Sequence, residues 1–398
     1  MVMKKVFINC CIYFLFIIQQ LFAQPSCISF NSIQYNQVSI DESVQYGGNQ
    51  LNFDGSSFTP NARLIKASEN LCSASPLLIL VHGGGFTVGT PDMMDSLSFR
   101  FAKYGYVCAS ISYRLGWPGG FCPVDSSEAI RAWYRSVQDI RGAIRFFKDN
   151  SLAFGIDTNN VFLAGWSAGG YAAIGAAYSD LTTESPSFCS DLGAIDGSLN
   201  LGNHSSRFKA LATFSSAFLF PNHITEGQKP GIIMFNNALD AYDIPLDCNK
   251  WWNYGQCQSS FPSACGITSM QPNLEQNNIT TANIVFNYNT SNEFNSHWLH
   301  NPVYFPYWEE EVDSMASFFQ GFISNEIPLS NINTPIVAIQ NYLIPAFTEY
   351  QLPFNYDGML YNIRGALISE VKSGRINTLS PGVYIFNSKL VKIKLIVI

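Results

Sequence analysis

The sequence predicts an α/β protein, with a mostly parallel central sheet, helices on both of its faces and a small all-β domain at the C-terminus. Two observations carry this prediction. Continuous apolar runs of strand length alternate with helical patterns through most of the chain, and the last part alternates short strands with turn residues. Of the 398 residues, 47% are hydrophobic and 13% are charged, which is typical of a folded core.

The chain divides into four expected parts. We expect a signal peptide at residues 1–23, a large α/β domain at 24–325, a linker at 326–335 and a C-terminal β-sandwich at 336–398. The signal is indicated by Lys4 and Lys5 before an apolar run that ends at Ala23. The alternative, a transmembrane anchor, is disfavoured because polar residues interrupt a run that is already short for a bilayer.

The cysteines and the net charge limit the classes of function. Removal of the signal leaves eight cysteines, and an even number in an exported chain indicates disulfides without choosing the pairs. Cys108 lies inside an apolar strand and is expected to be a buried free thiol. A zinc site is the rival interpretation, but the chain has no Cys-x-x-Cys pair, and we expect neither a metal nor a cofactor. The net charge of −7 argues against a nucleic-acid partner.

The first strongly apolar strand leads into a glycine-rich loop. Short segments from Cys27 to about Ser75 predict an antiparallel hairpin or meander. The run Leu77–Val81 is typical of a strand covered on both faces, and His82-Gly83-Gly84-Gly85-Phe86 follows it directly. Three successive glycines leave their backbone amides unobstructed, as an oxyanion hole requires; the alternative is a flexible loop.

A helix and a strand follow, and then a long amphipathic helix. We expect a helix near Asp95 to Tyr104 and a strand from Tyr106 to Tyr113. Asp125 or Ser126 then caps a helix whose apolar residues recur every three or four positions as far as Phe147. Four arginines lie mostly off its apolar stripe, and we expect them to form a solvated face with local ion pairs: Arg131, Arg135, Arg141 and Arg145.

The next apolar strand, Val161 to Ala164, ends in Gly165-Trp166-Ser167-Ala168-Gly169. This Gly-x-Ser-x-Gly sequence, followed by small helix-forming residues, predicts a strand, a sharp turn and a helix N-terminus with Ser167 exposed at the turn. The helix would aim backbone N–H groups and a positive dipole end at the reacting oxygen. An ordinary glycine-rich turn is the alternative.

Three more strands continue the sheet, at Ala210–Phe214, Gly231–Phe235 and Asn283–Phe286. Functional residues should lie just past the carboxyl ends of such strands. Asp240 follows the second of them, and Asp243 is its less favoured competitor because it fits a turn before Ile244-Pro245. His297 follows the third, with His300 as the competitor farther from the strand end. A histidine there can take the serine proton, and a carboxylate can fix its tautomer.

The order Ser167, Asp240, His297, with the His82–Gly85 loop upstream, resembles an α/β-hydrolase of the carboxylesterase and hormone-sensitive-lipase type. Tyr113-Arg114-Leu115 is similar to a segment found there, and the resemblance covers roughly residues 60 to 325. Trp166 departs from the small or acidic residue of many lipase-like members. The resemblance implies the α/β-hydrolase fold, with Ser167 as nucleophile, His297 as general base and acid, Asp240 as the residue that orients it, and the amides of Gly84, Gly85 and Ala168 as oxyanion hole.

Aromatic residues near these segments indicate an aromatic-lined substrate pocket. We expect Phe86, Trp166 and Trp298 to line it. The cysteine-rich segment 247–278 is either a rigid lobe that offers Trp251 and Trp252 to a sugar or aromatic acyl group, or an ordinary helix with a surface disulfide.

The tail predicts short antiparallel strands at 359–363, 366–371, 381–386 and 392–397. Its last third resembles the C-terminal sorting domain of type IX secretion, which implies that the tail is an export address recognised by export machinery. The alternative is a small binding module.

The sequence therefore predicts a secreted or cell-surface serine carboxylic-ester hydrolase with no stable membrane span after removal of the signal. We expect short-acyl or aromatic-acid esters as substrates, as small molecules or linked to polymers, including acetyl or feruloyl groups on polysaccharides. The alternatives are a lipase or polyester hydrolase, a serine peptidase of the same fold, and a non-catalytic binding protein built on it.

Overall fold

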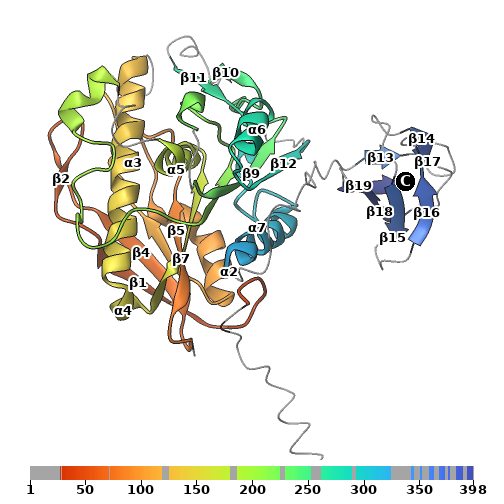
Figure 1. Cartoon of the computed structure of the whole chain (residues 1–398), viewed down its shortest axis with the longest axis horizontal. Helices are drawn as coiled ribbons and strands as arrows, with labels where there is room; N and C mark the ends of the chain where they lie inside the picture. The colour runs from red at the N-terminus through yellow and green to blue at the C-terminus, as the bar shows by residue number, and fades with distance from the viewer. Residues whose placement is uncertain are drawn as a thin grey trace, which may run out of the picture.

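The fold was obtained as a computed structural model (Figure 1). The structure describes residues 27, 29–70, 72–118, 125–179, 186–224, 229–251, 261–288 and 293–323, and in the C-terminal part 342–344, 350–351, 358–362, 367–372, 375–376, 382–388 and 392–397. The expected signal peptide and linker lie outside these residues, as do Cys122, Trp252 and Cys257.

An eight-stranded sheet organises the larger part of the chain, in the order β1-β4-β6-β5-β7-β8-β9-β12. Its strands are β1 (Val38–Gln45), β4 (Asn61–Ala67), β5 (Ser75–Val81), β6 (Val107–Ile111), β7 (Ile156–Trp166), β8 (Ala210–Phe214), β9 (Gly231–Asn237) and β12 (Thr281–Phe286). Strand β4 is antiparallel to both of its neighbours, and every other neighbouring pair is parallel. With helices on both faces, this arrangement is the α/β-hydrolase fold and confirms the predicted fold class.

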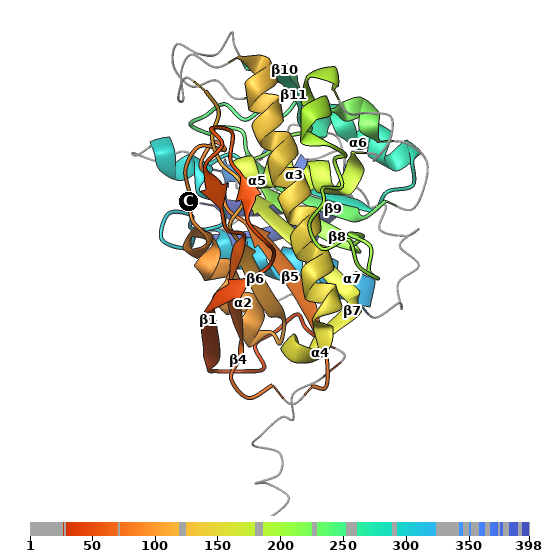
Figure 2. The ribbon, with the colours of Figure 1, turned by 90° about the vertical axis from the view of Figure 1, so that its left-hand side faces the viewer.

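Helices cover the two faces of the sheet (Figures 1 and 2). The helices are α2 (Asp95–Lys103), α3 (Ser126–Asp149), α4 (Ser151–Phe154), α5 (Ala168–Tyr178), α6 (Ile267–Gln276) and α7 (Trp308–Ile323). Alternate residues of β5 enter two separate apolar clusters: Leu77, Ile79 and Val81 pack with α3 and α5, whereas Leu78 and Leu80 pack with α2 and α7. This burial on both faces explains why β5 is a continuous apolar run.

The N-terminal segment forms the expected antiparallel pairs. Strand β1 pairs with β4, and β2 (Gln50–Leu51) pairs with β3 (Ser57–Phe58) as a small hairpin. A disulfide joins Cys27 to Cys72 across this region. Cys108 is a buried free thiol on β6, as expected.

The arginines of α3 correct one prediction. Arg131 is partly exposed and pairs with Asp191, whereas the side chains of the other three are buried, and Arg145 pairs with Asp196. Arg145 donates to the carbonyl of Leu199, and Arg141 donates to the carbonyl of Ser179. The expected solvated face is therefore covered by other backbone segments, whose carbonyl groups accept hydrogen bonds from the guanidinium groups.

A second disulfide, Cys248 to Cys265, joins β10 (Cys248–Lys250) to β11 (Ser263–Cys265), just before α6. The chain also contains four described 3-10 helices: η1 (Pro91–Met94), η2 (Ser187–Leu192), η3 (Pro221–His223) and η5 (Glu293–His297). Within the described residues, no helix combines the length and the apolar character needed to cross a bilayer.

The C-terminal strands form their own sheet, in the order β13-β19-β18-β15-β16, with a two-stranded ladder of β14 and β17. They are β13 (Tyr342–Ile344), β14 (Tyr350–Gln351), β15 (Gly358–Asn362), β16 (Leu367–Val371), β17 (Arg375–Ile376), β18 (Gly382–Ser388) and β19 (Lys392–Val397). The pairing is not wholly antiparallel as expected, because β13 runs parallel to β19.

Candidate active site

Segments far apart in the sequence meet at the carboxyl edge of the central sheet. The glycine loop follows β5, Ser167 follows β7, Asp240 follows β9, and His297 ends η5 beyond β12. Neighbouring strand ends are level, since Val81 pairs with Gly165 and Phe286 pairs with Asn237. The ladder of the sheet therefore brings the side chains that follow these strands together.

Ser167 occupies a sharp turn between β7 and α5. Its φ of 53° and ψ of −123° are unusual for a residue with a side chain. The glycines on either side let the turn close: a Cβ on Gly165 would lie 2.4 Å from the carbonyl oxygen of Gly169, and a Cβ on Gly169 would lie 2.2 Å from that of Val81. Both residues must therefore be glycine for helix α5 to pack this closely on the sheet.

The side chains of Ser167, His297 and Asp240 form one hydrogen-bonded line. Nε2 of His297 lies 2.9 Å from Oγ of Ser167, and Nδ1 of His297 lies 2.9 and 2.8 Å from the two carboxylate oxygens of Asp240. Because a carboxylate only accepts hydrogen bonds, Nδ1 carries the proton and Nε2 of the neutral ring is left to accept the serine hydroxyl. The three residues are at most 8% exposed.

Backbone amides place the Asp240 carboxylate. The amide of Tyr242 donates to Oδ1 of Asp240 over 2.9 Å, and the amide of Ala241 donates to Oγ of Ser296, next to the histidine. Asp243 instead occupies a turn, with a φ of 49° and its amide bonded to the carbonyl of Asp240. Of the two competing aspartates, the structure brings Asp240 to the histidine.

The backbone of His297 is held by side chains from three strand ends. The indole N–H of Trp166 donates to the carbonyl of His297 over 2.9 Å, and the hydroxyl of Ser215 donates to the same oxygen over 3.2 Å. Nδ2 of Asn237 donates to the carbonyls of Tyr288 and Ser296. Sequence reasoning missed Ser215 and Asn237, although both are polar residues at strand ends, which is the signal that identified Asp240.

His300, the competing histidine, faces away from Ser167. Its Nε2 donates to the carbonyl of Met93, and its ring lies 4.2 Å from that of Trp166, centroid to centroid. Complete burial lowers the pKa of His300 to about 3, so the ring is neutral. It packs against Trp166, and within the described residues the hydroxyl of Ser167 is bonded by His297 instead.

The glycine loop lies against the nucleophile. A Cβ on Gly83 would lie 3.0 Å from that of Ser167, and Gly84 and Gly85 have φ values of 107° and 60°, where glycine is favoured. Within the described residues, no backbone carbonyl accepts a hydrogen bond from the amides of Gly84 or Gly85. The amide of Ala168 belongs to the first residue of α5, so it has no partner within the helix. The described part of the chain therefore leaves these three N–H groups available to an anion.

His82, the buried first residue of this loop, stabilises the loop through a hydrogen bond and a ring contact. Its Nδ1 lies 2.7 Å from the carbonyl oxygen of Gly83, and its ring stacks on that of Tyr113 with centroids 4.5 Å apart. Burial lowers the pKa of His82 to about 4, so this histidine is neutral.

The expectation that Phe86 lines a substrate pocket is corrected by its burial. Phe86 has no exposed surface and packs between Tyr113 and Trp251, because the turn after the glycines directs its ring into the core. Trp251 is also fully buried and therefore offers no surface to a sugar. Trp166 is 3% exposed, and its ring packs against those of His300 and Trp298, at centroid distances of 4.2 and 4.3 Å.

Exposed apolar side chains are found beside the site instead. Val88 follows the glycine loop and is 62% exposed, and Leu239 precedes Asp240 and is 47% exposed. Tyr304, 39% exposed, packs on Trp298 at a centroid distance of 5.4 Å. Among the described residues there is no group of three or more histidine, cysteine, aspartate or glutamate side chains that could hold a metal ion.

A family model covers the first half of this site, and part of the chain is similar to known esterases and hydrolases. The family model BD-FAE matches residues 65–213, which contain the glycine loop and Ser167 but neither Asp240 nor His297. Gut esterase 1 of Caenorhabditis elegans is 32% identical over 112 residues, covering 28% of this chain and 19% of that protein. Phenmedipham hydrolase of Pseudarthrobacter oxydans is 38% identical over 98 residues, covering 24% of this chain and 19% of that protein. The chain thus aligns with about a fifth of the length of each relative.

Among solved structures, esterase B from Lactobacillus Rhamnosis is similar over 73% of this chain and 87% of its own, with 17% identity and a TM-score of 0.47.

Proposed function

We propose that this protein is a serine carboxylic-ester hydrolase that works through a covalent acyl-enzyme. The observation that carries the proposal is the line of hydrogen bonds from Ser167 Oγ through the His297 ring to the Asp240 carboxylate. It is supported by the amides of Gly84, Gly85 and Ala168 beside Ser167, by the family model that matches the segment containing this serine, and by the similarity of part of the chain to esterases.

The arrangement suits a two-step displacement. Ser167 Oγ attacks the ester carbonyl carbon while Nε2 of His297 takes its proton. The tetrahedral oxyanion accepts hydrogen bonds from the amides of Gly84, Gly85 and Ala168. As the intermediate collapses, the C–O bond to the alcohol breaks and His297 returns the proton to that oxygen. Water, deprotonated by His297, then cleaves the acyl-enzyme and restores Ser167.

Each part of the site has a distinct energetic role. Asp240 holds Nδ1 protonated and stabilises the imidazolium that forms, in surroundings where both side chains are almost completely buried. In this proposal the three amides bind the negative charge that develops on the carbonyl oxygen, and one such donor contributes about 10²- to 10³-fold in kcat. The strained turn presents the hydroxyl of Ser167 between these two groups.

Short-acyl or aromatic-acid esters are the proposed substrates. The exposed side chains of Val88, Leu239 and Tyr304 give the rim of the site an apolar character, and Tyr304 with Trp298 offers an aromatic surface next to His297. An apolar or aromatic acyl group would lose less hydration there than a charged one. Acetyl and feruloyl groups on polysaccharides belong to this class.

The test is hydrolysis of 4-nitrophenyl esters from acetate to palmitate, and of methyl ferulate, by the protein and by Ser167→Ala. We expect activity to fall at least about 10⁴-fold in the variant, because the nucleophile is lost. The chain-length profile separates a carboxylesterase from a lipase, and methyl ferulate tests the aromatic-acid class.

Ser98→Ala is the matched control for this experiment. Ser98 is a buried serine on α2 whose hydroxyl bonds the carbonyl of Met94, so its loss should leave kcat unchanged. Equal and negligible rates for the protein and Ser167→Ala would contradict the ester-hydrolase proposal and favour a peptidase or a binding protein.

We also propose that the protein is exported and acts outside the cell. The signal-like residues 1–23 and the resemblance of the tail to a type IX sorting domain support this, as do the two disulfides, since disulfides persist in oxidising compartments. In a bacterium with this secretion machinery, the protein should reach the medium or cell surface with Gln24 as its first residue. Export that persists after deletion of residues 336–398 would refute the role of the tail.

A further inference from the structure

The segment that follows β6 bonds both ends of the glycine loop. The hydroxyl of Tyr113 donates to the carbonyl of His82, the first residue of the loop, over 2.8 Å. The amide of Gly116 donates to the carbonyl of Phe86, the last residue of the loop, over 2.6 Å. Residues 113–116, called here the clamp segment, therefore span the loop that carries the amides of Gly84 and Gly85.

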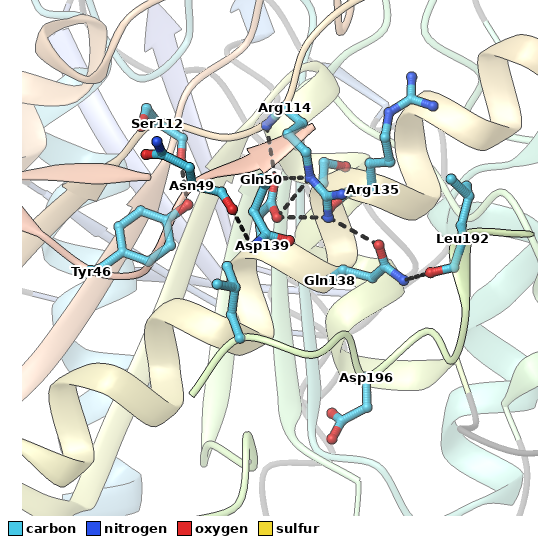
Figure 3. Close-up of polar contacts among 12 residues, drawn as sticks. Tyr46, Asn49, Gln50, Ser112, Arg114, Arg135, Gln138, Asp139, Leu192 and Asp196 are labelled. Carbon is cyan, nitrogen blue, oxygen red and sulfur yellow. Dashed lines mark hydrogen bonds and ion pairs between the residues drawn. The ribbon is translucent and has the colours of Figure 1, made fainter. Parts of the chain in front are cut away.

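A buried ion pair fixes the clamp segment to helix α3 (Figure 3). The guanidinium of Arg114 bonds the Asp139 carboxylate through Nε at 3.0 Å and Nη2 at 2.8 Å. The backbone amide of Arg114 donates to the same carboxylate over 2.8 Å. Asp139 is fully buried and Arg114 is 8% exposed. One carboxylate thus holds both the side chain and the backbone of Arg114.

Two further side chains of α3 complete these contacts. Nη2 of Arg114 donates to Oε1 of Gln138 over 2.9 Å, and Gln138 in turn donates to the carbonyl of Leu192 (Figure 3). Nη2 of Arg135 donates to the carbonyl of Gly116 over 2.7 Å. Gly116 is therefore held on both sides, by α3 through its carbonyl and by the glycine loop through its amide.

We infer that the clamp segment, held by Asp139, positions the oxyanion hole of the proposed esterase, with Tyr113 and Arg114 as positioning residues that touch no substrate. The inference rests on the proposed function and adds a role for residues behind the site. A loop of three glycines has more backbone freedom than any other sequence, and two of its φ values lie in the left-handed region. Its amides keep one direction only if the surroundings fix both ends of the loop.

This role concerns the transition state rather than substrate binding. The oxyanion exists only after Ser167 has attacked, so a tilt of the two amides weakens binding of the tetrahedral species and leaves binding of the ester unchanged. A misplacement of about 1 Å in a catalytic group costs about 100-fold in rate. Loss of the Tyr113 hydrogen bond is therefore expected to lower kcat and leave KM unchanged.

The variant that tests this is Tyr113→Phe, which removes one hydroxyl and keeps the ring that stacks on His82. We expect kcat for 4-nitrophenyl acetate to fall about 10- to 100-fold with KM unchanged within about twofold. A trifluoromethyl ketone bonds to Ser167 Oγ through its carbonyl carbon, and its carbonyl oxygen becomes an oxyanion in the proposed oxyanion hole. The affinity of Tyr113→Phe for this ketone should fall by the same factor. The corresponding methyl ketone, which forms much less adduct, should keep its affinity.

Tyr134→Phe is the matched control. Tyr134 is equally buried, lies on α3 and donates to a backbone carbonyl, that of Gly193, over 2.7 Å, but this carbonyl is not in the glycine loop. The two variants should have similar melting temperatures, and only Tyr113→Phe should lose kcat and affinity for the trifluoromethyl ketone. Equal kcat for the two variants, or a change of KM alone, would overturn the inference.

The same assay separates this inference from the proposed function. A protein that hydrolyses the ester in a Ser167-dependent way, with Tyr113→Phe as active as Tyr134→Phe, refutes the clamp and leaves the esterase intact. A protein with no Ser167-dependent activity refutes both.

Discussion

At the scale of single residues, the conformation of Ser167 is the feature on which the site depends. A backbone held in such a sparsely populated region costs on the order of 1–3 kcal/mol and persists only when its surroundings determine it. Here the surroundings are Gly165 and Gly169, which let α5 and β5 approach, and the amide of Ser167 itself, which donates to the carbonyl of Phe214. The turn is therefore imposed by packing on both of its sides.

Asp240 offers a prediction at this scale. In Asp240→Asn the side chain keeps its shape but presents an amide that can donate to Nδ1, which favours the wrong tautomer of His297. We expect kcat to fall about 10⁴-fold with little change in KM, as for the equivalent change in other serine triads. Steady-state kinetics on 4-nitrophenyl acetate would measure it.

Asp243→Asn is the control, because Asp243 lies in the adjoining turn, whereas Asp240 is the residue whose carboxylate lies at hydrogen-bond distance from Nδ1 of His297. Its kcat should stay within about twofold of the parent protein. If Asp243→Asn lost activity and Asp240→Asn retained it, the assignment of the acid would be reversed.

At the scale of elements, helix α7 carries a buried carboxyl group within an apolar face. Trp308, Val312, Met315 and Phe319 of this face pack against the sheet, and Glu311 lies among them at 1% exposure. No described residue hydrogen-bonds either carboxyl oxygen of Glu311. Burial raises the pKa of Glu311 well above its ordinary value of 4.5, so the group stays protonated to a higher pH in the folded protein than in the unfolded chain.

Replacement of this residue should therefore stabilise the protein in a pH-dependent way. Above pH 4.5 the unfolded chain releases the proton of Glu311 and the folded protein keeps it, so stability falls as the pH rises toward the folded pKa. Between these two pKa values, each pH unit lowers the free energy of unfolding by about 1.4 kcal/mol. Glu311→Met should raise the melting temperature by an amount that grows as the pH rises above 4.5, as calorimetry can measure.

Asp313→Met is the control for this prediction. Asp313 is an exposed carboxylate on the same helix. Its replacement should change the free energy of unfolding by less than about 0.5 kcal/mol throughout the same pH range. A stability gain in Glu311→Met that did not vary with pH would contradict the protonated state of Glu311.

At the scale of the whole molecule, the eight-stranded central sheet and the five-stranded C-terminal sheet share no strand. Every residue of the proposed mechanism belongs to segments before α7, and the described residues that position them also lie there. We therefore expect deletion of residues 336–398 to leave kcat and KM for 4-nitrophenyl esters within about twofold of the full chain. A large loss of kcat in a folded deletion variant would show that the tail contributes to the site.

The sequence predicted the fold class and the meeting of Ser167, Asp240 and His297, because apolar runs mark buried strands and parallel strands present their carboxyl ends at one edge. It failed on the arginines of α3. Periodicity places a side chain on a face of a helix, but it does not report whether an irregular segment elsewhere in the chain covers that face.

The same limit applies to the pocket residues. An aromatic residue after a glycine loop can enter the core or the site, and the choice depends on the φ of the turn, which is 60° at Phe86 and is not encoded in residue type alone. The support of His297 by Ser215 and Asn237 also escaped prediction, because hydrogen bonds to backbone carbonyls leave no periodic pattern.

The close packing of α5 on β5 bears on how such sequences diverge. Gly165 and Gly169 are required by the distance between helix and sheet, and this requirement remains when the serine between them is replaced. A related protein that lacked the serine but kept this packing of helix on sheet would still need both glycines. The glycine pair therefore reports how closely the helix packs on the sheet, whereas Ser167, Asp240 and His297 together carry the proposed chemistry.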